Sequence, residues 1–338
     1  MIGLNHLEVE EIIRRALIED IGSGDITTAL VVPQKSTCRA QIIAKEEGVV
    51  CGLQVAALTF KMVADMYAAG ENPVVRKIQS TRKVAGGSVI GGSEPTHISI
   101  KHMNSVEVIK PGGPTQVQVS KSKGVVFRPE VTDGIDVEPG DLIAEITGPT
   151  HPILTAERTA LNFLQRLSGI ATKTARFVEL VQGTDAVIVD TRKTTPGLRI
   201  LEKYAVRVGG GRNHRFGLFD AILIKDNHIL AAGGLKRAVQ AARAAAPHMM
   251  KIEVEVESLE QVEEALQAGA DIILLDNMSP ALLRKAVALC KGKALTEASG
   301  GTTESSVARI AETGVDMISV GALTHSAKAL DMSLEIIG

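Results

Sequence analysis

Residues 251–276 read "KIEVEVESLEQVEEALQAGADIILLD" and contain one complete strand–helix–strand unit. Apolar, β-branched runs begin and end the stretch, and a segment with helical spacing lies between Ser258 and Gly269. Ser258, with Gln261 three residues later, fits the glutamine form of the capping box that starts a helix. A glycine after the last turn is a typical helix stop. The stretch therefore predicts two parallel strands joined by a helix.

The same unit repeats from about Asp185 onward. Six short apolar runs alternate with Ala- and Leu-rich helical stretches; the runs are "DAVIVD", "AILIKD", "KIEVEV", "DIILLD", "KALTEA" and "MISVGA". Charged residues follow five of the runs, and a Gly-Ala turn follows the sixth. The carboxyl ends of the strands of an α/β barrel converge on one mouth, where its site is built. Reactive side chains at successive strand ends therefore favour a barrel over an open doubly wound sheet.

Residues 1–150 have a different pattern and predict a small α/β domain ahead of the barrel. "CRAQIIAKEEGVVCGL" and "DVEPGDLIAEITGP" resemble short strands with turns, and "QVAALTFKMVADMY" has helical spacing. Within this domain, residues from about 70 to 123 are rich in Gly, Pro, Ser, Thr and Lys, which indicates an inserted, hairpin-bearing excursion. His97 and His102 lie in it without a third ligand at metal spacing. The barrel is expected over 151–324, followed by a tail over 325–338.

The composition excludes several classes of function. The 338 residues are 45% hydrophobic and 22% charged, which suits a chain with a sizeable core. Aromatic residues make up only 2% and the formal net charge is -2, so neither stacking platforms nor a polycationic field for nucleic acid is expected. No apolar run is long enough to span a membrane, and the acidic N-terminal turns are unlike a signal peptide. Three isolated cysteines suggest reduced thiols in a cytoplasmic protein.

Positive charge is concentrated between Asp190 and Gly217. Seven Arg and Lys residues lie there together with His214, opposed only by Asp190 and Glu202. Arg199, Lys203 and Arg207 have helical spacing and are expected to be solvated surface charges. The others of interest lie in Gly- and Thr-rich turns near strand ends, where side chains can point into the mouth: Arg192, Lys193, His214 and Arg215. Because the whole chain is nearly neutral, this local excess predicts a site for small anions.

Two glycine turns predict phosphate binding. "EASGGTTESS" places Ser299, Gly300 and Gly301 after a strand and before a helix, where free backbone amides bind phosphate. "SVGALTHS" provides a second turn, at Gly321 and Ala322, after the next strand. The loops after the last two strands are the usual phosphate site of such barrels.

Carboxylates also lie on two of the predicted strands or at their ends. Glu253, Glu255 and Glu257 share one face of their strand because side chains alternate, and like charges on a buried face need matching cations. Asp276 ends the next strand, so Glu255 and Asp276 form a candidate Mg²⁺ site. Salt bridging to Lys225 or Arg192 is an equal alternative for them. Lys225 is itself a candidate Schiff-base lysine, as in barrel aldolases, although its charged neighbours fit anion binding at least as well.

Together these segments resemble the quinolinate phosphoribosyltransferases, also called nicotinate-nucleotide pyrophosphorylases (carboxylating). The matching motifs cover nearly the whole chain outside residues 70–123. They are "EDIGSGDITT", "TAERTALNFLQRLSGIAT", "DTRKTTPGLR", "KYAVRVGGGRNHRFGLFDAILIKDNHI", "EVEVESLEQ", "ILLDNMSP", "EASGG" and "VGALTHS".

The resemblance implies an enzyme of NAD biosynthesis that joins quinolinate to phosphoribosyl pyrophosphate and releases pyrophosphate and carbon dioxide, leaving nicotinate mononucleotide. It implies an N-terminal α/β sandwich, an irregular seven-stranded α/β barrel, and a C-terminal tail that packs back on the N-terminal domain. It also implies at least a homodimer, in which the partner's N-terminal domain covers each barrel mouth.

The resemblance also assigns roles to residues. Arg192, His214, Arg215 and Lys225 line the quinolinate pocket, joined by Arg158 from the partner subunit. Lys193 faces the phosphoribosyl donor, and Glu255 and Asp276 serve its Mg²⁺. The residues expected to hold the 5-phosphate are Ser299, Gly300, Gly301, Gly321 and Ala322.

Three other functions remain open at the level of sequence. The runner-up by mechanism is a Schiff-base barrel aldolase that uses Lys225. A paralogous phosphoribosyltransferase acting on another aromatic acid is a closer rival. A non-catalytic phosphoribosyl-binding regulator is disfavoured because "DTRKTTPG" and the Glu255/Asp276 pair are both intact.

Overall fold

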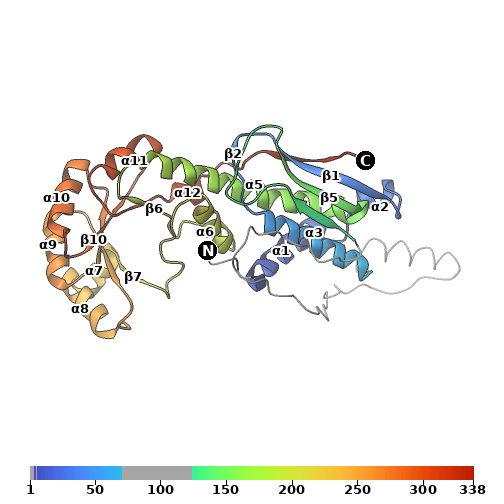
Figure 1. Ribbon diagram of the computed structural model, residues 1–338. Helices are drawn as coiled ribbons and strands as arrows, with labels where there is room; N and C mark the ends of the chain where they lie inside the picture. The colour runs from blue at the N-terminus through green and yellow to red at the C-terminus, as the bar shows by residue number, and fades with distance from the viewer. Residues whose placement is uncertain (1–3, 5, 71–123) are drawn as a thin grey trace, which may run out of the picture.

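The computed structural model describes Leu4, residues 6–70 and residues 124–338. It has two parts, joined by one long helix, α5 (Thr150–Leu180) (Figure 1). The predicted excursion lies outside the described residues, except for Gly70 at its start. None of the helices in the described ranges is both long and apolar enough to cross a bilayer.

The N-terminal part is built on an antiparallel four-stranded sheet whose last strand comes from the end of the chain. The order is β12 (Met332–Ile336), β1 (Thr37–Ala44), β5 (Leu142–Pro149) and β3 (Val126–Pro129). Alternate residues of β1 are fully buried, namely Ala40, Ile42 and Ala44. A second, two-stranded ribbon pairs β2 (Gly48–Val49) with β4 (Asp136–Val137). Because β12 pairs with β1, the tail of the chain completes this sheet.

Helices cover this sheet and connect it to the second part. They are α1 (His6–Ile21), α2 (Ile26–Val31), α3 (Leu53–Ala68) and α5. The predicted helix in "QVAALTFKMVADMY" is confirmed as α3, which packs against α5 and contacts β3, where its buried Phe60 ring lies 5.9 Å from that of Phe127. The second half of α5 contacts α6 (Arg199–Val208) and β6 (Val187–Val189). Helix α5 thus packs against elements of both parts.

The second part contains a parallel sheet of six strands, and all six predicted runs form strands. Their spatial order is β6, β11 (Met317–Ser319), β10 (Leu295–Ser299), β9 (Ile272–Asp276), β8 (Ile252–Val256) and β7 (Ile222–Ile224). Beyond β6, Arg212 forms a single parallel bridge with Val189. The α/β barrel class is confirmed. The seventh strand is here a single bridging residue, so the barrel is irregular.

The remaining helices of this part are α7 (Asp226–Ala232), α8 (Leu235–Ala245), α9 (Leu259–Ala268), α10 (Pro280–Cys290), α11 (Glu304–Ala311) and α12 (Ala322–His325). Figure 1 shows α8, α9 and α10 on the outside of the sheet and α12 beside α5 and α6. The expected cap at Ser258 is confirmed, because its side chain accepts a hydrogen bond from the Gln261 N–H. The Ser279 side chain caps α10 in the same way, accepting from the Leu282 N–H. Gly269 ends α9 with a φ of 85°, a conformation that favours glycine.

The strand register divides the sheet into an apolar and a charged face. Val254, Val256, Ile273 and Leu275 are at most 1% exposed and face the helices. The residues between them point to the other face, where Glu253 is level with Leu223 and Glu297 with Leu274. The charged side chains of neighbouring strands therefore meet inside the irregular barrel.

Candidate functional site

The wall of the site opposite β6 carries a cation and two carboxylates. Lys225 follows β7, and its ammonium group makes an ion pair with the Glu255 carboxylate on β8. Asp276 ends β9 level with Ser299 of β10 and lies on the same face as Glu255. The salt-bridge alternative for Glu255 is therefore realised with Lys225. This contact engages the amine that a Schiff-base mechanism would need free.

Asn277 connects Asp276 to the glycine turn beside it. Its side-chain amide donates to the Asp276 carboxylate (Nδ2···Oδ2 2.7 Å), and its backbone N–H donates to the Ser299 carbonyl (2.9 Å). Asn277 has a φ of 54°, the one positive value among the described non-glycine residues. A β-carbon on Gly300 would lie 2.1 Å from the Asn277 Oδ1, so only glycine fits there. The turn is thus shaped by a close approach between two strand ends.

The predicted phosphate loops flank this point. Gly300 and Gly301 have φ values of 99° and 56°, and α11 begins three residues later. After β11, Gly321 precedes the short helix α12, which starts at Ala322. A β-carbon on Gly321 would lie 3.0 Å from the Lys193 Cδ, so the Lys193 side chain lies against this turn. The structure therefore brings Lys193 together with the second glycine turn.

Two arginines come from segments beside β6. Arg192 follows β6, and its backbone carbonyl accepts a hydrogen bond from Arg199 on α6 (3.3 Å). Arg215 lies between α6 and β7, and it lines a cavity of about 400 Å³ at the free edge of β7. The Arg215 guanidinium donates to the Ala221 carbonyl (3.2 Å). This hydrogen bond holds the Arg215 side chain along the edge of β7.

Lys203 corrects a prediction. Helical spacing suggested a solvated surface charge, but its side chain is only 2% exposed and makes an ion pair with Asp190, which is fully buried. Arg199 and Arg207 are only partly exposed, and each donates hydrogen bonds to loop residues: Arg199 to Thr194 and Arg207 to Asn213. The helix was predicted correctly, but its polar face packs against the loops of the site instead of water.

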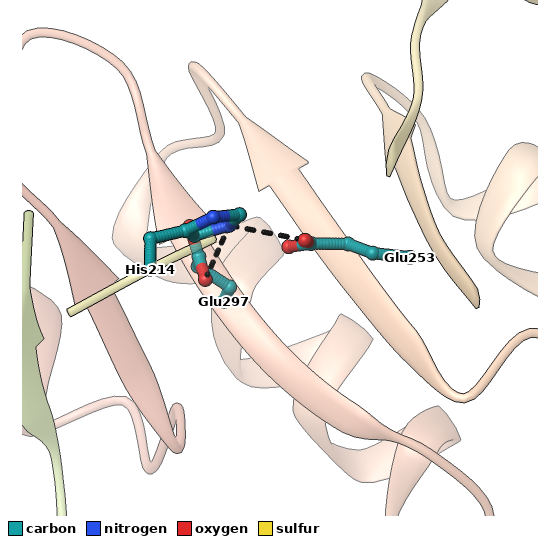
Figure 2. Close-up of side chains that lie close together, drawn as sticks. All are labelled: His214, Glu253 and Glu297. Carbon is teal, nitrogen blue, oxygen red and sulfur yellow. Dashed lines mark ion pairs between the residues drawn. The ribbon is translucent and has the colours of Figure 1, made fainter. Parts of the chain in front are cut away.

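A buried cluster of His214, Glu253 and Glu297 lies deeper in the barrel (Figure 2). The His214 Nε2 lies 3.0 Å from the Glu253 Oε2 and 3.6 Å from the Glu297 Oε2. The His214 Nδ1 accepts a hydrogen bond from the Arg215 N–H (2.7 Å), so in this geometry the ring proton is on Nε2. Sequence reasoning did not select either glutamate. The signal was present, because Glu253 shares a strand face with Glu255 and Glu297 ends a run.

Burial and charge determine how this cluster titrates. Burial, and then the charge of Glu253, raise the pKa of Glu297 to about 7. Burial alone would lower the pKa of His214, but the hydrogen bond to Glu253 and the charge of Glu297 raise it overall. A proton on Glu297 relieves the repulsion between two buried carboxylates. The three donor atoms lie close enough for a metal ion, but internal hydrogen bonds already engage the ring.

Glu297 should make the stability of the protein depend on pH. A carboxyl group whose pKa is higher in the folded than in the unfolded state binds its proton more tightly when folded. The free energy of unfolding should therefore fall as pH rises from about 4.5 to about 7. Glu297→Gln, which keeps the shape without the titration, should flatten this dependence in thermal unfolding measured across that range. An unchanged slope in the variant would contradict the assignment.

Buried polar atoms without partners also indicate a ligand site. Among the described residues, four such side-chain atoms are found: Arg192 Nε, Glu253 Oε1, Glu297 Oε1 and Thr302 Oγ1. All four lie on the charged face or on the loops around it. Unsatisfied buried groups are uncommon in proteins and call for a bound partner or a catalytic role. Their concentration here marks the barrel mouth.

Arg158 is the one predicted site residue that the chain does not bring to its own mouth. It is exposed on the third turn of α5, and α5 contacts α6 further along the helix, where Arg166 pairs with Glu202. Arg166, which does reach the loops of the site, is eight residues later, or about 12 Å along a helix axis. The other predicted residues surround the mouth: Arg192, Lys193, His214, Arg215, Lys225, Glu255, Asp276, Ser299, Gly300, Gly301, Gly321 and Ala322.

Comparison with known families covers both parts of the chain. Residues 170–335 match the family "Quinolinate phosphoribosyl transferase, C-terminal domain". Residues 25–95 and 105–168 match the corresponding N-terminal domain.

Similar proteins are found among curated and solved proteins alike. A "Probable nicotinate-nucleotide pyrophosphorylase (carboxylating)" of Bacillus subtilis is 40% identical over 333 residues, covering 98% of this chain and 95% of its own. The Mycobacterium leprae protein named nicotinate-nucleotide pyrophosphorylase (carboxylating) is 39% identical, with 96% and 95% covered. The crystal structure of NadC from Streptococcus pyogenes is 37% identical and superposes with a TM-score of 0.78, with both chains fully covered.

Proposed function

Because the chain belongs to the quinolinate phosphoribosyltransferase family, we propose that it transfers the phosphoribosyl group of phosphoribosyl pyrophosphate to quinolinate. Carbon dioxide and pyrophosphate leave, and nicotinate mononucleotide enters NAD biosynthesis. The observation that carries the proposal is the layout of the mouth. Cationic side chains follow the strands at both ends of the sheet order, β6 and β7. Between them lie the two glycine turns after β11 and β10 and the carboxylate pair on β9 and β8.

The roles of the residues follow from charge and shape. Quinolinate carries two carboxylates on a planar ring, which suit the planar forks of Arg192 and Arg215 and the ammonium group of Lys225. The phosphate group of the donor suits the free amides around Gly300 and Gly321, with Lys193 lying against the second turn.

A magnesium ion fits Glu255 and Asp276. Both are carboxylates on one face of adjacent strands, the ligand type that Mg²⁺ takes together with substrate phosphates. When bound, the ion would neutralise the pyrophosphate leaving group. The same Glu255 carboxylate pairs with Lys225.

The chemistry requires positioning and charge more than proton transfer. The quinolinate nitrogen forms a bond to the anomeric carbon as the bond to pyrophosphate breaks. The ring nitrogen then carries a positive charge. When the adjacent carboxylate leaves as carbon dioxide, its bonding electrons pass into the ring, and a proton from water replaces it. The pocket must hold that carboxylate in place without preventing its departure.

A second copy of the chain completes the proposed site. The position of Arg158, exposed and remote from its own mouth, supports its contribution to the partner's quinolinate pocket in a two-fold dimer. The three cysteines, all unpaired, support a reducing, cytoplasmic setting.

Substrate charge gives the test. Nicotinate lacks the second carboxylate, so the cationic wall would be left partly unmatched, and kcat/KM for nicotinate should be lower by about 100-fold or more. The comparison is a steady-state assay with both acids at a fixed donor and Mg²⁺ concentration. Equal turnover of nicotinate would point to a paralogous enzyme that uses another aromatic acid. Trapping of a carbonyl substrate on Lys225 by borohydride would instead support the aldolase alternative.

A further inference from the structure

Two adjacent residues of α6, Glu202 and Lys203, are almost completely buried and charged. Each forms an ion pair, and the two pairs extend to different loops of the mouth. Burying charges of either sign is costly, and a buried ion pair is weak evidence for stability by itself. Burial raises the pKa of Asp190 and lowers that of Lys203, which reflects this cost. Two such pairs side by side therefore need another explanation.

The first pair fixes the backbone beside Arg215. The Lys203 ammonium group donates to the Asp190 carboxylate and to the His214 carbonyl (3.1 Å). The same Asp190 oxygen accepts the His214 N–H (2.8 Å), so the pair binds both backbone groups of His214. The Asn213 side chain donates to the other Asp190 oxygen (2.7 Å).

The His214 ring connects this fixed backbone to Arg215. Its Nδ1 accepts the Arg215 N–H, and its Nε2 faces Glu253. The chain of contacts from Lys203 therefore ends at Arg215, the residue that we assign to the dicarboxylate.

The second pair fixes the backbone beside Lys193. The Glu202 carboxylate accepts from Arg166 (2.8 Å) with one oxygen and from the Thr195 N–H (3.0 Å) with the other. Arg166 also donates to the carbonyl of Thr324 on α12 (2.6 Å). The Thr324 hydroxyl in turn donates to the Lys193 carbonyl (2.9 Å). This pair therefore joins the Lys193 loop to the turn that contains Gly321.

We propose that α6 positions the two substrates separately. Lys203 acts on the dicarboxylate wall, formed by His214 and Arg215. Glu202 acts on the phosphoribosyl-donor wall, formed by Lys193 and the Gly321 turn. Neither residue touches a substrate; each acts through the loop that it holds. The inference rests on the proposed assignment of Arg215 to quinolinate and of Lys193 to the donor. It goes beyond that assignment because it predicts that adjacent substitutions on one helix affect different substrates.

The test is a crossed comparison of Lys203→Met with Glu202→Gln. Lys203→Met removes both bonds of the ammonium group. Glu202→Gln removes the charge and leaves one acceptor oxygen for two donors, Arg166 and the Thr195 N–H. Lys203→Met should raise the KM for quinolinate about ten-fold, with the donor KM within about two-fold of wild type. Glu202→Gln should do the reverse. Quinolinate titration calorimetry should show the same difference between the two variants.

Tyr204→Phe is the matched control on the same helix. Its hydroxyl donates to Asp133 in the N-terminal part (2.8 Å), away from both walls. It should lower the melting temperature without changing either KM. If this control raises a KM as much as its neighbours do, or if both KM values rise together in Lys203→Met and in Glu202→Gln, α6 is only structural and the proposal is wrong.

Milder variants keep the test decisive if a buried charge substitution prevents folding. Asn213→Ala, which removes the amide bound to Asp190, should reproduce the quinolinate effect. Thr324→Val, which removes the hydroxyl bound to the Lys193 carbonyl, should reproduce the donor effect. Arg215→Ala and Lys193→Ala test the site assignment itself, separately from the positioning role of α6. If these direct variants have the expected effects and the α6 variants do not, only the positioning proposal fails. If Arg215→Ala leaves the quinolinate KM unchanged, the site assignment fails first.

Discussion

Arg158→Ala and Asp276→Ala are each expected to reduce turnover by about 1,000-fold, and mixing the two should restore activity. In a two-fold dimer with shared sites, each site combines one barrel with the Arg158 of the other chain. A mixed dimer then has one site with every required group and one site that lacks both. Random exchange of equal amounts makes about half of the dimers mixed, so activity should recover to about one quarter of wild type.

The experiment requires chains that exchange, by co-expression or by joint refolding, and native mass measurement of the mixed species. Arg176→Ala is a matched control, because Arg176 is also exposed on α5. It should keep wild-type activity alone and gain nothing on mixing. Recovery near zero in verified mixed dimers would place Arg158 in the site of its own chain.

Asp276→Asn should reduce kcat/KM for the phosphoribosyl donor by about 100-fold while quinolinate binding is largely kept. The substitution preserves the shape of the side chain beside Asn277 but removes the charge that we assign to the Mg²⁺ of the donor. The measurement is donor and quinolinate affinity by calorimetry, each with and without Mg²⁺, together with steady-state kinetics.

Asp271→Asn, before the opposite end of the same strand, is the control. Asp271 pairs with Arg243 and accepts the Ile252 N–H, so its loss should lower stability without changing the Mg²⁺ dependence of donor binding. If Asp276→Asn lost quinolinate affinity and kept donor affinity, the roles of the two walls would be reversed.

Local patterns predicted the barrel well because its units are local. The alternation in "KIEVEV" and the Ser258 and Gly269 signals specify β8, α9 and its ends within one short segment. The pairing of β12 with β1 joins residues almost 300 apart, and no local pattern in either strand specifies it. Only the family resemblance implied that the tail packs on the N-terminal domain.

Sequence patterns predicted which kinds of residue form the site, but not how deeply each side chain is buried. Alternation placed Glu253 and Glu255 on one face, but it could not show that Glu253 is buried against His214 while Glu255 pairs with Lys225. Lys203 was misplaced for a similar reason. Helical spacing tells which residues share a face, and the burial of that face depends on the 212–215 segment that folds back onto it.

The most direct test of the function is the fate of the carboxylate next to the ring nitrogen. Quinolinate labelled at that carboxylate should be incubated with the protein, phosphoribosyl pyrophosphate and Mg²⁺. The account predicts labelled carbon dioxide released in a one-to-one ratio with pyrophosphate and nicotinate mononucleotide, and none when the donor is left out. Label retained in a nucleotide product, or no nucleotide formed at all, would contradict it.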